Sequence, residues 1–137
     1  MDGQWHGLNG SRLQSMVEGH TARSFDGALS SLHVHVIEIG GLVLDQVREA
    51  SRAYTEWDAQ CAEGVIEREP AVNAYDARLG EEQLTLIARR QPVASDLKAV
   101  IAMSRAVAEL ERIGDHARNL ARHLLSIRTA GTHPAAG

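Results

Sequence analysis

The amino-acid sequence predicts an all-α fold, an antiparallel bundle of three helices. Three long segments each repeat apolar residues at steps of three, four or seven, which are the spacings that keep one face of a helix apolar. No segment shows the alternating pattern of a strand. Of the 137 residues, 44% are hydrophobic and only 4% are aromatic. This length is sufficient for one compact domain and too short for two ordinary ones.

The first predicted helix carries an apolar stripe between residues 29 and 57. The stripe consists of Leu29, Leu32, Val36, Ile39, Val43, Val47, Ala50, Tyr54 and Trp57. Asp58 follows it and is suited to cap the next helix. Residues 1–19 hold four glycines and no sustained apolar period, so we expect a flexible leader there and a similar tail over residues 129–137. The predicted domain therefore spans residues 20–128.

The second predicted helix has an apolar residue at every seventh position. These residues are Val65, Val72, Leu79 and Leu86. Such a recurrence keeps one face toward a neighbouring helix. Pro70 interrupts the segment, and a proline inside a helix costs on the order of 3 kcal/mol, unless it occupies the first turn of a new helix. We expect a kink or a break near Glu69.

The third predicted helix has the strongest amphipathic pattern in the chain. Its apolar residues are Val93, Leu97, Val100, Met103, Val107, Leu110, Ile113, Ala117, Leu120, Leu124 and Ile127. The residues Gln91, Pro92 and Val93 predict a short turn before it, so the second and third helices form an antiparallel hairpin. Residues equidistant from this turn should face each other.

The hairpin brings acidic and amide side chains to matched depth. Glu111, Asp115 and Asn119 follow one another at steps of four, and pairing about the turn places Asp76 opposite Glu111 and Asn73 opposite Asp115. Clustered oxygen ligands suit Mg²⁺, Mn²⁺ or iron, so this is a candidate metal site. The alternative, which the spacing alone favours, is a solvated surface where nearby basic side chains offset the repulsion between Glu111 and Asp115. These side chains are Arg112, His116, Arg118 and Arg122.

Other features exclude several function classes. No histidine follows a glutamate at the Glu-x-x-His spacing of a di-iron enzyme, and no phosphate loop or nucleophile elbow is present, so we do not expect an enzyme. A net charge of −4 without a basic run argues against nucleic acid. No stretch approaches the roughly 20 apolar residues of a membrane span. A lone cysteine, Cys61, and the lack of a signal-peptide core favour the cytoplasm.

Several segments resemble the PhoU type of phosphate-transport accessory protein, between about His20 and Leu125. The most specific are ARRQPVASDLK and LERIGD. The resemblance implies an antiparallel three-helix bundle. It also implies a cytoplasmic negative regulator of phosphate uptake and phosphate-starvation signalling, acting between a phosphate ABC transporter ATPase and a sensor histidine kinase, with multinuclear metal clusters on the bundle face.

The resemblance also assigns residues to the metal site. Glu111 and Asp115 match the family's E-x-x-x-D motif, Asn119 matches the asparagine that follows, and Asp76 matches an acidic position of the partner helix. The second acidic position of that helix is Gly80 here, which supplies no ligand. Family members usually contain the three-helix unit twice, whereas this chain contains it once. We therefore expect a homodimer that rebuilds the six-helix assembly. A metal-independent helical adaptor is the alternative function.

Overall fold

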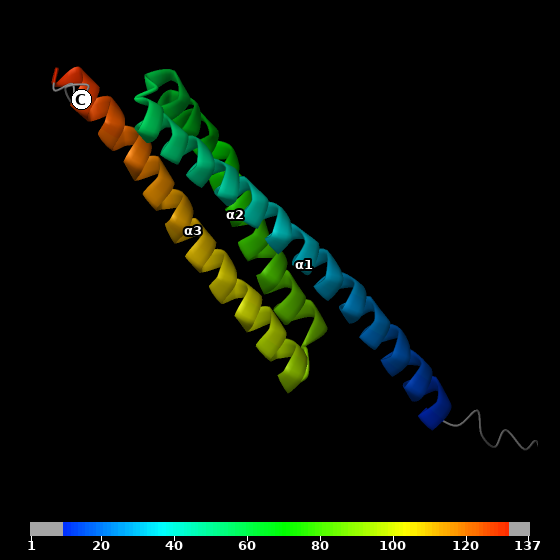
Figure 1. Ribbon diagram of the computed structural model, residues 1–137. Coiled ribbons are helices and arrows are strands. Elements are labelled where there is room, and N and C mark those ends of the chain that lie inside the picture. The colour runs from blue at the N-terminus through cyan, green and yellow to red at the C-terminus, as the bar shows by residue number, and fades with distance from the viewer. Residues whose placement is uncertain (1–9, 132–137) are drawn as a thin grey trace, which may run out of the picture.

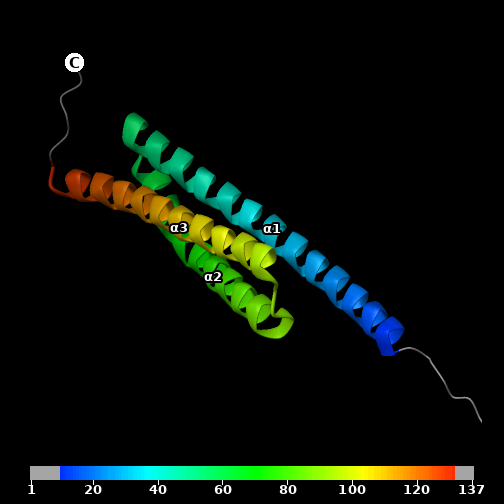
Figure 2. The same ribbon diagram turned by 90° about the horizontal axis from the view of Figure 1, so that it is seen from below.

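The computed structural model describes the backbone of residues 10–131 and the side chains of residues 12–16 and 25–131. Three helices account for nearly all of this part of the chain: α1 (Gly10–Glu56), α2 (Ala59–Arg90) and α3 (Ala94–Thr129). They run up, down and up, and each helix packs against the other two (Figures 1 and 2). The predicted all-α, antiparallel three-helix bundle is confirmed.

Helix α1 is longer than the sequence pattern predicted. It begins at Gly10, so residues 10–19 of the predicted leader are helical, while residues 1–9 lie outside the described residues. Its first turns extend past the turn between α2 and α3 (Figure 1), and Leu13 and Met16 are exposed there. A helix that is already nucleated gains one hydrogen bond for each residue added, so it can propagate without an apolar stripe. Of the predicted tail, residues 132–137 lie outside the described residues.

The two turns are where the sequence placed them. Asp58 caps α2, and its carboxylate accepts a hydrogen bond of 3.1 Å from the backbone N–H of Cys61. At the other end of α2, Gln91 adopts a left-handed conformation with φ 42°, and its N–H bonds to the carbonyl of Ile87. The chain then reverses over Pro92 and Val93 before α3 begins at Ala94. Both predictions from turn residues are confirmed.

Pro70 lies inside α2, which continues without a break. The break that we considered near Glu69 is therefore wrong. Proline has no N–H, so the Ile66 carbonyl one turn earlier loses its usual helical partner. Val65 and Leu79, on either side of Pro70, are both almost completely buried. Burial of such side chains contributes about 1.5–3 kcal/mol each, which is enough to hold the helix through the proline.

The core divides into two clusters along the bundle. The cluster nearer the α2–α3 turn contains large side chains, namely Phe25, Leu32, Ile39, Val43, Leu79, Leu86, Val100, Met103 and Val107. The cluster nearer the α1–α2 turn contains mainly small ones, namely Ala50, Ala53, Cys61, Ala62, Val65, Ala117, Ala121 and Leu124. Small residues allow the helices to approach closely. Tyr54, which we placed in the apolar stripe, is 39% exposed.

Within the described residues, the segment Phe25–Glu56 is long and apolar enough to cross a bilayer by length and composition alone. The expectation from the sequence that no stretch approaches a membrane span is therefore wrong for this segment by length and composition. One side of the segment packs into the bundle core through residues such as Leu32 and Ile39, while Val34, Ile37 and Leu44 lie on the opposite, exposed side. The high hydropathy therefore arises because α1 is apolar on two faces.

Candidate functional site

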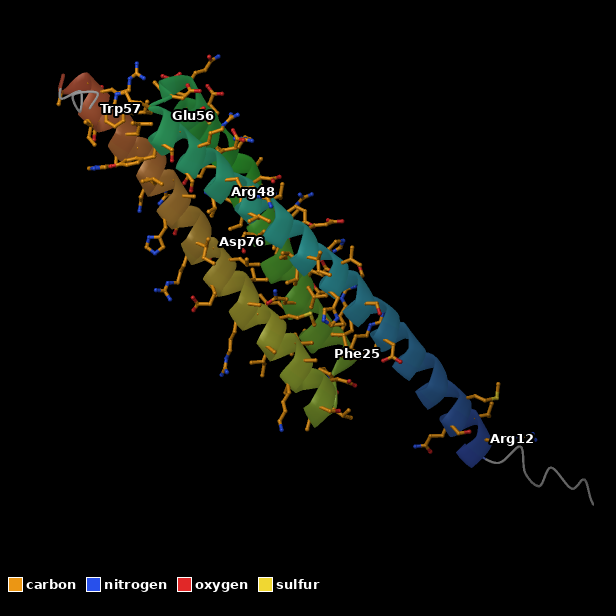
Figure 3. All side chains as sticks on the ribbon, viewed as in Figure 1. Arg12, Phe25, Arg48, Glu56, Trp57 and Asp76 are labelled. Atoms are coloured by element: carbon orange, nitrogen blue, oxygen red, sulfur yellow. The ribbon has the colours of Figure 1, made fainter. Side chains whose placement is uncertain are left out.

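The predicted acidic residues of α2 and α3 do meet at the middle of the bundle, where Figure 3 labels Asp76. They surround a small hollow of about 10 Å³. We call this region the acidic face, and its polar residues are Gln46, Glu69, Asn73, Asp76, Glu111 and Asp115. A volume of this size holds roughly one water molecule. The predicted pairing of the two helices is therefore confirmed.

Asn119 does not join this group. Its side chain is exposed, and it does not line the hollow. It lies one turn beyond Asp115, toward the α1–α2 turn. The polar contacts with α2 at that level are made by Arg118 and Arg122 instead, both of which reach Glu69.

Two carboxylates in the acidic face influence each other. Burial raises the pKa of Asp76 above its ordinary value, and the neighbouring negative charge of Asp115 raises it further. Both effects disfavour the ionised form of Asp76. Asp115 has a side chain that is 47% exposed, so solvent partly screens its charge.

Helix α1 contributes one residue to the acidic face that the sequence analysis missed. Gln46 is 4% exposed, and its Oε1 atom is buried without a hydrogen-bond partner among the described residues. A Cβ atom on Gly114 would lie 3.1 Å from that oxygen, so the glycine permits the close approach of α1 and α3 here. The clue in the sequence was a glutamine between Val43 and Ala50, inside the apolar stripe.

Arg118 lies between the carboxylates of α2 and α3. Its guanidinium donates a short hydrogen bond to Glu69, and Nη1 lies 3.4 Å from Asp115 Oδ1. Arg122 adds a second ion pair, 3.6 Å from its Nη2 atom to Glu69 Oε2. The side chains of Arg118 and Glu69 are 21% and 16% exposed. The contact with Glu69 raises the pKa of Arg118 further above its ordinary range. This part of the acidic face has the arginine compensation that the alternative interpretation expected.

The remaining ligands do not fit a multinuclear metal cluster. In the described part of the chain, no group of three or more His, Cys, Asp or Glu side chains is arranged to hold a metal ion. Glu69 and Asp115 already contact Arg118. Gly80 offers no ligand, and no other side chain lies within 4 Å of where its Cβ would be. Oxygen atoms of Asn73, Asp76, Glu111 and Gln46 are what is left around the hollow.

A second polar region lies in the groove between α1 and α2. It encloses about 340 Å³ and is lined by His35, Glu38, Tyr75, Arg78, Leu79 and Glu82. The Nδ1 atom of His35 lies 2.6 Å from Glu82 Oε2, and the Tyr75 hydroxyl donates to Glu38. Burial and the hydrogen bond to Glu38 raise the pKa of Tyr75 to about 12. This α1–α2 groove was not predicted from the sequence, because a register was derived only for α2 and α3.

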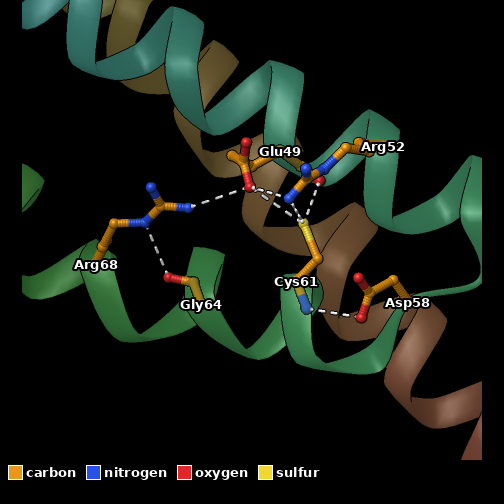
Figure 4. Close-up of polar contacts among 6 residues, drawn as sticks. All are labelled: Glu49, Arg52, Asp58, Cys61, Gly64 and Arg68. Carbon is orange, nitrogen blue, oxygen red and sulfur yellow. Dashed lines mark hydrogen bonds and ion pairs between the residues drawn. The ribbon is translucent and has the colours of Figure 1, made fainter.

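A third polar cluster connects the end of α1 to the start of α2 (Figure 4). The thiol of Cys61 lies 3.2 Å from Glu49 Oε2, and Arg52 Nη2 lies 3.4 Å from the same sulfur. Arg68 approaches Glu49 at 4.0 Å and bonds to the Gly64 carbonyl. Cys61 is buried and nevertheless has polar neighbours. These contacts stabilise the junction of the two helices.

Comparison with known proteins gives the chain its family. The family model of the PhoU domain matches residues 36–124. The phosphate-specific transport system accessory protein PhoU homolog of Pseudomonas putida is 37% identical over 115 residues, which cover 84% of this chain and 45% of that protein. The accessory protein PhoU of Escherichia coli K12 is 39% identical over 106 residues, covering 77% of this chain and 44% of that protein.

A solved structure agrees with the sequence relatives. The crystal structure of PhoU from Pseudomonas aeruginosa superimposes with a TM-score of 0.75 at 37% identity, covering 80% of this chain and 53% of that one. The chain thus spans about half the length of the relatives it matches. The residues matched by the family model include all of α2, most of α3, the part of α1 from Val36 onward and the whole acidic face. The chain belongs to the PhoU domain family.

Proposed function

We propose that this chain regulates phosphate uptake and phosphate-starvation signalling as an accessory component of a phosphate transport system. The observation that carries the proposal is the match to the PhoU domain over residues 36–124, supported by relatives named as accessory proteins of phosphate-specific transport. We place it in the cytoplasm, where it would contact the ATPase of a phosphate ABC transporter or a sensor histidine kinase. The proposal involves contacts and no catalysis.

The exposed side of α1 is the surface that we assign to these contacts. Ile37 is 72% exposed, Val34 is 52% exposed and Leu44 is 47% exposed, all on the side of α1 that faces away from the core. Apolar side chains grouped on one exposed face are typical of interaction sites. Because these positions do not support the core, charged substitutions there should leave the bundle folded.

The test is repression of phosphate-starvation genes in a bacterium that lacks its own PhoU. Expression of this chain should restore repression in phosphate-rich medium, and the Ile37→Glu variant should lose it while keeping its helical circular dichroism and melting temperature. Val93→Glu, at an equally exposed apolar position in the α2–α3 turn, is the control. Failure of the wild-type chain to repress would contradict the proposed function. Turnover of a phosphate ester that disappears in Glu111→Ala would instead indicate an enzyme.

We also propose that two copies associate to replace the second half of the longer relatives. A shallow groove of about 350 Å³ between α2 and α3 is lined by Leu84, Ile87 and Ile101, which are 69%, 36% and 41% exposed. An apolar groove of this kind suits an isologous contact between identical subunits. Native mass spectrometry should show a dimer, and Leu84→Glu should convert it to a monomer. Ile37→Glu, on the other side of the bundle, should remain dimeric.

Binding of iron, Mn²⁺ or Mg²⁺ at the acidic face stays a prediction. Its ligands would be Asn73, Asp76, Glu111, Asp115 and Asn119, of which Asn119 lies away from the hollow. The proposed regulation does not require a metal, because the surfaces assigned to contacts lie elsewhere on the bundle. A metal-independent adaptor is thus the form of the function that the arrangement of side chains supports best.

A further inference from the structure

Four carboxylates come together in the acidic face between α2 and α3. Glu69 and Asp76 from α2 and Glu111 and Asp115 from α3 all line the same small hollow. Ionised carboxylates that line one small hollow repel one another unless a cation lies among them. A bound metal ion is one source of positive charge, and a side chain of the protein is another.

Arg118 is positioned as that cation. It contacts Glu69 on α2 and Asp115 on α3, so one guanidinium neutralises carboxylates on both helices. Its Nε atom is buried and its side chain is 21% exposed, so most of the guanidinium lies within the α2–α3 interface. Arg122 contacts Glu69 alone, and its side chain is 57% exposed. The two arginines therefore differ in how deeply they enter the acidic face.

A metal ion would have to compete with this guanidinium. Two of the carboxylates that a metal could use are already paired with Arg118, and a divalent cation between them would be repelled by its positive charge. Arginine stays protonated in proteins at all accessible pH values, so a change of pH cannot remove the competitor. Gly80 leaves no additional carboxylate on α2 that could compensate for the occupied pair.

We propose that Arg118 supplies the positive charge that a metal ion would otherwise supply at the acidic face. The contact between α2 and α3 then forms without a metal. The inference does not rest on the proposed regulatory function, because it concerns only what neutralises Glu69 and Asp115. The residue that decides between a metal-binding and a metal-free face is then Arg118, with Gly80 as a second, smaller factor.

The experiment measures Mn²⁺ binding to the full chain by isothermal titration calorimetry and by the change in melting temperature. Wild-type protein should show no discrete binding in millimolar Mn²⁺. Arg118→Gln should bind Mn²⁺ at least about tenfold more tightly than wild type, because the competing charge is gone. Arg118→Lys, which keeps a positive charge, should behave like wild type. Arg122→Gln, the matched control, should also stay close to wild type.

The opposite results would overturn the inference. Wild type that binds Mn²⁺ as tightly as Arg118→Gln would show that the guanidinium does not exclude metal. Lack of binding by both proteins would show that Arg118 is not what excludes metal. Should Arg118→Gln fail to fold, Arg118→Met is the second variant. Methionine replaces the apolar stem of the arginine side chain and removes the charge. The same two comparisons with wild type then apply to it. These assays measure metal directly, so their result is independent of whether the chain represses phosphate-starvation genes.

Discussion

Carboxylates of neighbouring helices meet in two places in this bundle, and different groups neutralise them. In the acidic face between α2 and α3, Glu69 and Asp115 contact Arg118, which carries a permanent charge. In the α1–α2 groove, Glu38 and Glu82 contact Tyr75 and His35. A guanidinium remains charged at every accessible pH, whereas the Tyr75 phenol loses its proton at high pH. The comparison indicates that alkaline pH should affect the α1–α2 groove more than the Arg118 contacts.

The largest effect is expected when the acidic face loses Glu69. Glu69→Gln removes the charge that Arg118 and Arg122 share, and it leaves Arg118 in the interface with only Asp115 as a partner. Breaking a fully buried pair costs about 3–5 kcal/mol, and the partial exposure here reduces the expected loss to about 1–3 kcal/mol. Urea denaturation measures the free energy of unfolding.

The control for this variant is Glu109→Gln. Glu109 pairs with Arg112 on the surface of α3, and the two side chains are 66% and 70% exposed. Exposed pairs of this kind contribute about 0–1 kcal/mol, so the control should lose little stability. Equal losses in the two variants would mean that the acidic face is an ordinary solvated surface.

Much of the fold follows from the sequence because helical periodicity is a local property. The three helices, the Asp58 cap and the turn at Gln91 each depend on residues close together in the chain. The matched depth of Asp76 and Glu111 follows from the turn alone, since an antiparallel hairpin fixes its own register. Two predictions were wrong, namely the break near Glu69 and the start of the first helix after residue 19. Both relied on local propensities, which core packing and helix propagation overcame.

The missed parts of the site depend on contacts that helical periodicity does not specify. Gln46 reaches the acidic face only because α1 packs closely against Gly114 of α3. Arg118 has a long side chain, and whether it reaches across to Glu69 or extends into solvent depends on the distance between two helices. The α1–α2 groove depends on the register of α1 on α2. The short turn at Trp57 and Asp58 fixes that register as the α2–α3 turn does, but residues were paired from the sequence only across the α2–α3 turn.

An intermediate effect is expected in the α1–α2 groove from Tyr75→Phe. The substitution removes the hydroxyl that donates to Glu38 and should lower the free energy of unfolding by about 1 kcal/mol. The pKa of Tyr75 is raised to about 12, so the folded protein holds this proton more tightly than the unfolded chain. The contribution should therefore be fully present below pH 10 and decline as pH rises from 10 toward 12.

Urea denaturation of wild type and Tyr75→Phe at several pH values tests this dependence. Tyr54→Phe is the control, because Tyr54 also has an aromatic neighbour, Trp57, and is 39% exposed. It should show a smaller loss. A difference between wild type and Tyr75→Phe that stays constant up to pH 12 would contradict the assigned role of the hydroxyl.

A gain in stability is expected at Gly80, beside the acidic face. A helical glycine costs about 0.8–1 kcal/mol relative to alanine, and a Cβ added at Gly80 would meet no other side chain. Gly80→Ala should therefore raise the free energy of unfolding by about 0.5–1 kcal/mol. Gly114→Ala is the contrast, because its Cβ would press on Gln46 Oε1 at 3.1 Å. Thermal melts should rank Gly80→Ala as the more stable variant.

The smallest effect is expected from Asp76→Asn, and its sign distinguishes the two accounts of the acidic face. Burial and Asp115 raise the pKa of Asp76, so the folded protein binds this proton more tightly than the unfolded chain does. The ionised carboxylate therefore lowers stability at neutral pH, and the cost disappears as pH falls through the raised pKa toward the ordinary value of 3.8. Asp76→Asn should melt slightly above wild type at neutral pH. The two melting temperatures should coincide at a pH low enough to protonate Asp76 in both the folded and the unfolded protein.

A metal ligand would behave in the opposite way, because asparagine would weaken metal binding and lower the melting temperature when Mn²⁺ is present. A melting temperature for Asp76→Asn below that of wild type in Mn²⁺, and above it in chelator, would therefore show that a cation other than Arg118 occupies this face.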